Sequence, residues 1–121
     1  MKLIALILIT LVAVEHIYIL WIEMFAWTTK GRTTFKSFPA ELFEPTRKLA
    51  ANQGLYNGFL AAGLIWSLLI GDPLWAKNVA IFFLGCVVVA GLYGGITAGK
   101  AILVKQMLPA AIALGAVLVW M

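Results

Sequence analysis

The chain has 121 residues, of which 64% are hydrophobic and 12% are charged, and its formal net charge is +4. Soluble domains average about 45–50% apolar and about 25% charged residues, so this composition excludes a disordered chain, a nucleic-acid-binding domain and almost any ordinary soluble enzyme. The length suits one domain with four membrane crossings of roughly 20 residues each.

Four hydrophobic segments follow one another, and we expect transmembrane helices over about 3–27, 46–70, 74–97 and 101–121. The first begins like a signal peptide, but no cleavage site of small residues follows, which predicts an uncleaved membrane helix. Gly71, Asp72 and Pro73 supply a C-terminal glycine, an N-cap and a proline at the first helical position, so the second and third helices should form a tight hairpin. Pro109 should kink the fourth helix. The sequence therefore predicts an all-α polytopic membrane protein whose single domain, residues 1–121, is a four-helix bundle.

The connection over residues 28–45 is the only long one, and basic residues gather in and beside it. Phe35, Phe38, Leu42 and Phe43 recur in it at near-helical spacing, which fits either a segment lying in the headgroup plane or an ordinary polar loop. Seven Lys and Arg residues fall on the side of this connection and two on the other. The positive-inside rule then places the long loop in the cytoplasm and both termini outside.

Polar side chains inside the predicted first helix lie on one face. Glu15, His16 and Glu23 share that face, which must point into the bundle or a cavity because polar groups are costly in lipid. Glu15 and His16 lie near the middle of the membrane, and Glu23 lies close to the cytoplasmic end. These three are the candidates for acid–base catalysis or a proton relay.

The other three helices add polar residues in the cytoplasmic half, and the outer half is nearly bare of them. This asymmetry predicts a polar pocket open to the cytoplasm, floored by Glu15 and His16. The alternative is a buried hydrogen-bond network that only locks the helices together. A ligand in the pocket would meet seven further side chains: Asn52, Gln53, Tyr56, Asn57, Tyr93, Lys105 and Gln106.

Metal and cofactor motifs do not occur in the sequence. His16 is the single histidine and Cys86 the single cysteine, so neither a zinc site nor an internal disulfide is expected. No glycine-rich phosphate loop or nucleophile elbow is present. We therefore expect no metal and no cofactor.

The chain resembles the bacterial domain-of-unknown-function 1304 family in motifs that span nearly its whole length. They are EHxYI at residues 15–19, EMFxWT at 23–28, AANQGLYNGFLAAG at 50–63, FLGC at 83–86, VAGxYG at 89–94 and QxxPA at 106–110. The resemblance implies a small four-helix protein of the bacterial inner membrane, and it brings no assigned reaction. It also implies that the polar residues singled out above belong to the family's own motifs.

Three functions are compatible with these features. The first is binding of a small amphipathic or lipid-derived molecule that enters from the cytoplasmic leaflet, either with or without its chemical processing. The second is proton-coupled transport of a small solute through Glu15 and His16. The third is a structural or accessory role beside another membrane protein. Membrane lipids are the expected surroundings, nucleic acid is not an expected partner, and the small helical domain should self-associate as a trimer or dimer.

Overall fold

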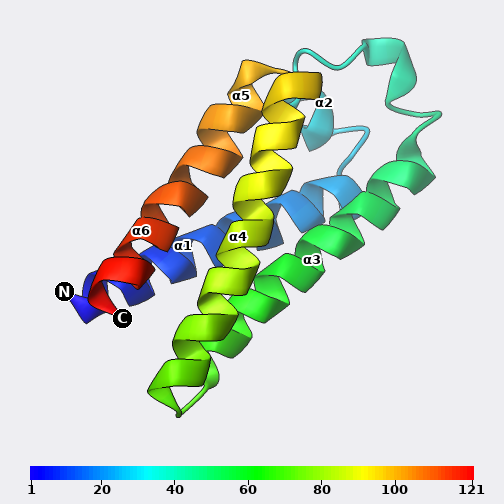
Figure 1. Cartoon of the computed structure of the whole chain (residues 1–121). Helices are drawn as coiled ribbons and strands as arrows, with labels where there is room; N and C mark the ends of the chain where they lie inside the picture. The colour runs from blue at the N-terminus through cyan, green and yellow to red at the C-terminus, as the bar shows by residue number, and fades with distance from the viewer. The chain divides into compact units, whose positions relative to one another are not determined.

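The computed structural model describes all 121 residues, and the chain is all-α (Figure 1). The long helices are α1 (Lys2–Phe25), α3 (Arg47–Leu69), α4 (Pro73–Thr97) and α6 (Leu108–Trp120). A short helix, α5 (Lys100–Ile102), and a π-helical segment, η2 (Leu103–Met107), lead directly into α6. The connection between α1 and α3 holds α2 (Lys30–Thr34) and the 3-10 helix η1 (Ala40–Leu42). α1, α3 and α4 begin and end within two residues of the predicted bounds, whereas the fourth predicted helix, 101–121, is divided among α5, η2 and α6.

Three helices are long and apolar enough to cross a membrane: Lys2–Phe25, Pro73–Thr97 and the continuous stretch Lys100–Trp120. They indicate a multi-pass membrane protein. α3 has 23 residues but is not among the three. Its N-terminal half carries Asn52, Gln53 and Asn57, which lower its mean hydropathy.

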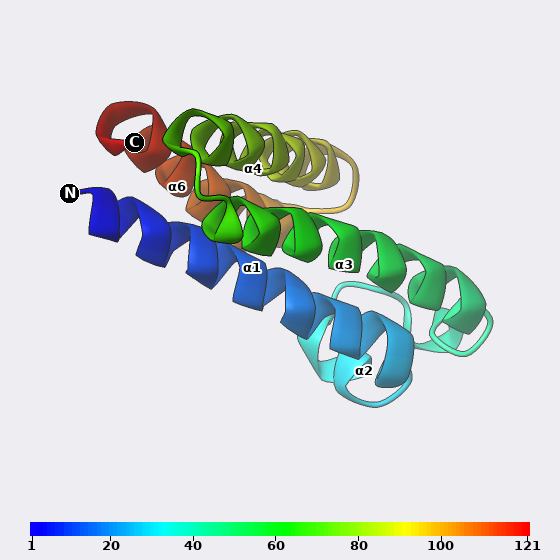
Figure 2. The ribbon, with the colours of Figure 1, turned by 90° about the horizontal axis from the view of Figure 1, so that it is seen from below.

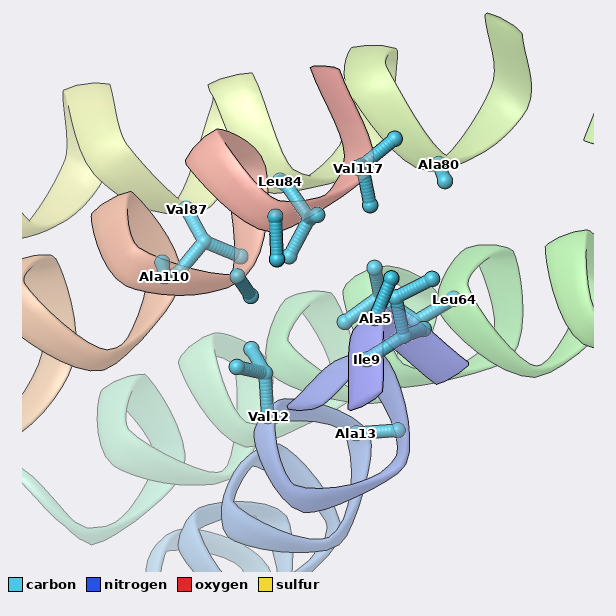
Figure 3. Packing of buried hydrophobic residues seen from close by; sticks show 12 residues of the cluster. Ala5, Ile9, Val12, Ala13, Leu64, Ala80, Leu84, Val87, Ala110 and Val117 are labelled. Carbon is cyan, nitrogen blue, oxygen red and sulfur yellow. The ribbon is translucent and has the colours of Figure 1, made fainter. Parts of the chain in front are cut away.

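The chain divides into two compact units, and α1 and α3 each contribute to both. Unit 1 consists of residues 1–14 and 60–121, and unit 2 of residues 15–59. The hydrophobic core of unit 1 draws side chains from α1, α3, α4 and α6 (Figure 3). Every member of this cluster is apolar: Ala5, Ile9, Val12, Ala13, Leu64, Ala80, Leu84, Val87, Ala110, Ala113, Ala116 and Val117.

Within unit 1, α4 lies side by side with α6 and η2 (Figures 1 and 2). α4 and η2 approach closely at Gly91, where an added Cβ would lie 2.7 Å from the backbone nitrogen of Met107. In η2 the Leu108 N–H bonds to the carbonyl of Leu103, a π-type turn directly before Pro109. The irregularity expected in the fourth helix therefore takes the form of a widened turn, which commonly precedes or accompanies a break in the regular hydrogen-bond ladder.

The hairpin between α3 and α4 forms as predicted. The Asp72 side chain accepts a hydrogen bond of 2.9 Å from the Trp75 N–H, and Pro73 occupies the first turn of α4. This N-cap satisfies one of the amide groups that a helix leaves unpaired at its start.

In unit 2, the last turns of α1 lie against the first turns of α3 (Figure 2). Two glycines permit the contact: an added Cβ at Gly54 would lie 2.8 Å from Met24 Cγ, and one at Gly58 would lie 2.6 Å from Leu20 Cδ1. Small residues at this spacing are typical of helices that approach closely in lipid.

Candidate functional site

The buried polar centre of unit 2 is the pair Glu23 and Asn57. Glu23 near the end of α1 is only 4% exposed and Asn57 on α3 is 9% exposed. The amide nitrogen of Asn57 donates a hydrogen bond of 2.5 Å to the Glu23 carboxylate, and it also lies 3.4 Å from the backbone carbonyl of Gln53. The sequence predicted both residues as site residues, and the structure brings these two together.

Glu23 has no cationic partner. The chain forms one ion pair, between the exposed side chains of Arg47 and Glu44 at 3.3 Å, and none involves Glu23. An unpaired charge is costly in a buried, apolar setting. The carboxyl group therefore either holds a proton or accepts a cation or hydrogen-bond donor from outside the chain.

His16 lies on the same face of α1 as Glu23. It is two helical turns, or about 10 Å, nearer to the N-terminus of the helix. Its side chain is fully buried, and its neighbour Glu15 is half-buried. The face shared by His16 and Glu23 was predicted from helical periodicity. Glu15 sits at the edge of this buried face rather than at its centre.

The remaining predicted site residues divide between the two units. Asn52, Gln53 and Tyr56 belong to unit 2 and are exposed along α3, where the Tyr56 ring meets Phe59 edge to face. In unit 1, Tyr93 and Lys105 are exposed and Gln106 is half-buried.

An open, shallow groove runs along the surface of α4 in unit 1. Its volume is about 730 Å³, and its lining side chains are apolar apart from Tyr93 and the thiol of Cys86: Ile81, Phe82, Gly85, Cys86, Val89, Ala90 and Tyr93. An apolar surface of this kind on a membrane-crossing helix suits contact with acyl chains. Across the whole chain, no group of three or more His, Cys, Asp or Glu side chains is placed to hold a metal ion.

An aromatic cluster lies in unit 2, beyond the end of α1. The Trp27 ring contacts three rings of the long connection, Phe35 and Phe38 at 5.5 Å and Phe43 at 4.9 Å between centroids. The indole N–H donates to the Thr46 hydroxyl at 3.0 Å, and this hydroxyl bonds in turn to the Leu42 carbonyl at 2.7 Å. The phenylalanines thus turn towards Trp27 rather than forming one face of a helix in the headgroup plane.

Arg32 fastens this cluster to the backbone. Its Nε donates to the Thr28 carbonyl at 2.7 Å and its Nη1 to the Ala40 carbonyl at 2.9 Å, while the guanidinium lies 5.2 Å from the centre of the Phe43 ring. Hydrogen bonds of a guanidinium to carbonyls and its contact with a ring both stabilise a loop conformation. The long connection is therefore a folded cap that ties the end of α1 to the start of α3.

The comparison with known proteins gives a clear family assignment. The model of a family of proteins of unknown function, DUF1304, matches residues 10–118. The chain belongs to the DUF1304 family. An uncharacterized protein of Lactococcus lactis, YpaA, is 33% identical to it over 110 residues, which cover 88% of this chain and 89% of the relative. No solved structure matches the chain.

The cap of this DUF1304 protein contains the structural residues that the sequence reasoning missed. Trp27 appeared only within a motif, Thr46 was not singled out, and Arg32 was counted only as a topogenic charge. A tryptophan followed by three phenylalanines in the connection between α1 and α3 was the available signal. It indicates aromatic packing but does not reveal which ring lies at the centre.

Proposed function

We propose that the chain crosses the membrane four times, because α3 spans it in addition to the three long apolar helices. The long connection then lies in the cytoplasm, and both ends of the chain lie outside. A helix of 23 residues is about 35 Å long, which exceeds the roughly 30 Å hydrocarbon core. The polar residues that lower the hydropathy of α3 lie in its first half, and Asn57 there is already paired with Glu23. The excess of Lys and Arg around residues 30–48 supports the orientation.

We further propose that unit 2 binds the polar head of a small amphipathic molecule, with Glu23 as the recognising group. One observation carries this proposal: a carboxyl group that is 4% exposed is held by a single amide and has no cation within reach. Buried ionisable residues inside membrane segments commonly mark functional sites. Asn57 orients the carboxylate and leaves its remaining lone pairs for a second donor.

The position of Glu23 supports a particular chemistry for the proposed ligand. It lies two residues before the end of α1, at the depth where a head group would sit just below the membrane surface. A carboxylate accepts hydrogen bonds or attracts a cation, so the head should carry an amine, an amide or hydroxyl groups. A tail lying among apolar side chains makes the ligand amphipathic. The proposal concerns binding and leaves turnover aside.

The test is native mass spectrometry of the protein extracted from its own membranes in mild detergent, before and after collisional stripping. The wild type should carry a defined small adduct, whose mass identifies the ligand, on a trimer or dimer. Glu23→Gln keeps the size and an acceptor for Asn57, but it loses the negative charge and replaces the second carboxylate oxygen by a hydrogen-bond donor, so the adduct should disappear. Glu41→Gln is the matched control, because Glu41 is an exposed carboxylate in the same unit. Wild-type occupancy in Glu23→Gln, or a wild type without adduct, would overturn the proposal.

A second candidate, proton-coupled transport, has its own supporting observation. His16 is fully buried near the middle of α1, beside the half-buried Glu15 and on the face of Glu23. Such a series of titratable groups along one helix suits a proton relay. Substrate-dependent proton flux in proteoliposomes that is abolished by His16→Gln would favour this function, and absence of flux across a broad solute panel would count against it.

A further inference from the structure

The cap, together with the first two residues of α3, presents a basic surface over residues 30–48 that the proposed ligand site does not use. Residues 30–48 carry five basic side chains, namely Lys30, Arg32, Lys36, Arg47 and Lys48, against two acidic ones, Glu41 and Glu44. This stretch thus holds more than half of the chain's Lys and Arg residues. These charges do not lie on an unstructured loop, because the cap is folded around Trp27, whose indole N–H donates a hydrogen bond to the Thr46 hydroxyl.

The basic residues of the cap fall into two groups. Arg32 bonds to two backbone carbonyls and Arg47 pairs with Glu44, so both are engaged within the chain. Lys30, Lys36 and Lys48 are exposed, and their ammonium groups form no ion pair or hydrogen bond with the chain. Three free cations are therefore available to an external anion.

Exposed apolar side chains accompany these lysines in unit 2. Phe25 at the end of α1 is 73% exposed, Leu49 beside Lys48 is 72% exposed, and Leu42 in η1 is 41% exposed. Large apolar groups in the same unit as exposed cations, close to the end of a long apolar helix, are typical of the boundary between headgroups and acyl chains. A surface facing only water or a soluble polyanion would not need them.

We propose that this cap binds anionic phospholipids of the surrounding leaflet. Lys30, Lys36 and Lys48 bind the headgroup phosphates, while Phe25, Leu42 and Leu49 contact the upper part of the acyl chains. The rigid aromatic core fixes the positions of the lysines, so less conformational freedom is lost on binding than in a disordered polybasic segment. The lipid interaction holds the cap against the membrane surface above Glu23, independently of whether that residue binds a ligand.

The experiment compares two lipids with the purified full-length protein in detergent micelles. Binding of phosphatidylglycerol and phosphatidylcholine is measured by titration and native mass spectrometry, and inorganic phosphate is added as a competitor. The wild type should prefer phosphatidylglycerol. Because one lysine near an anionic surface changes affinity by about fivefold, the triple variant Lys30→Gln, Lys36→Gln, Lys48→Gln should lose phosphatidylglycerol affinity by roughly 100-fold.

Two further triple variants make the result specific. Lys2→Gln, Lys77→Gln, Lys100→Gln has the same net charge as the cap variant and should retain the preference. Lys30→Arg, Lys36→Arg, Lys48→Arg keeps the cap cations, so it should also retain the preference and provides a result if the Gln variant does not fold. Equal binding of both lipids by the wild type, an equal loss in the control variant, or displacement of the lipid by millimolar inorganic phosphate would each overturn the proposal.

Discussion

A carboxyl group between two apolar helices requires a hydrogen-bond donor, and Asn57 is the donor that Glu23 has. The pair joins residues 34 positions apart, so it fixes the register of α1 against α3 as well as the direction of the carboxylate. Hydrogen bonds between membrane helices contribute about 0.6 kcal/mol on average and up to about 1.7 kcal/mol. The value here should lie towards the upper end, because both side chains are buried.

The first prediction concerns this pair. Asn57→Leu leaves the buried carboxyl without a donor and should lower the free energy of unfolding by about 1–3 kcal/mol. Glu23→Leu together with Asn57→Leu should recover part of that loss, with a coupling of about 0.6–1.7 kcal/mol. Unfolding in mixed micelles, followed by circular dichroism, measures the stability of the wild type, the two single variants and the double variant. Glu41→Leu with Asn78→Leu, two exposed residues in different units, should show no coupling, and additive effects at Glu23 and Asn57 would contradict the geometry.

At the scale of elements, glycines determine how closely the helices approach. Gly91 and Gly85 lie on the same helix, α4, but in opposite settings. A Cβ at Gly91 would lie 2.7 Å from Met107 N and 2.8 Å from Met107 Cα, whereas a Cβ at Gly85 would meet nothing within 4 Å. The backbone of Met107 cannot move aside as easily as the end of a flexible side chain. Gly91 and Gly85 should therefore respond differently to the same substitution.

We therefore predict opposite signs for two alanine substitutions in α4. Gly91→Ala should destabilise unit 1 by about 1–3 kcal/mol, because η2 must shift away from α4. Gly85→Ala should be neutral or stabilising by up to about 1 kcal/mol, because alanine is the better helix former. Thermal unfolding of both variants in the same detergent provides the measurement. A Gly91→Ala protein as stable as Gly85→Ala would show that α4 and η2 do not pack as described.

Local signals were sufficient to predict the long helices. Hydrophobic length defined the spans, and the N-cap at Asp72 and the proline at residue 73 defined the hairpin, because these act over a few residues. Pro109 indicated an irregular turn, but its π-helical form in η2 and its packing against Gly91 did not follow from the sequence. The folded cap could not be derived, since the convergence of three rings on Trp27 is a tertiary property.

The candidate site was predictable in part for a similar reason. The face of α1 that holds His16 and Glu23 followed from periodicity and is buried. On α3, Asn52, Gln53, Tyr56 and Asn57 were all expected to face the predicted pocket, yet only Asn57 is buried. Gly54 and Gly58 set the direction in which α3 approaches α1 most closely, and of the four polar residues Asn57 lies nearest to that side of the helix.

At the scale of the whole molecule, buried polar groups and apolar core separate along the chain. Unit 2, which contains the cap, holds the buried polar residues His16, Glu23 and Asn57. The core of unit 1 is apolar. The one buried polar side chain of unit 1, Ser67, donates a hydrogen bond to the Leu64 carbonyl at 2.6 Å. The buried ionisable side chains therefore all belong to unit 2, which also holds the long connection.

Whether α3 spans the membrane decides the proposed topology, and the single cysteine makes this testable. In a Cys86→Ala background, Ser37→Cys labels the cap and Gly71→Cys labels the hairpin between α3 and α4; Ser37 is exposed and a Cβ at Gly71 meets nothing within 4 Å. If α3 crosses, the two positions lie on opposite sides. A membrane-impermeant maleimide should then label Gly71→Cys in intact spheroplasts and Ser37→Cys only in inverted vesicles. Labelling of both positions from the same side would mean that α3 does not cross the membrane and lies along its surface. The absence of α3 from the helices that are apolar enough to span a membrane is consistent with that outcome. The positive-inside orientation would be wrong if the two labels appeared on opposite sides but in the reverse order.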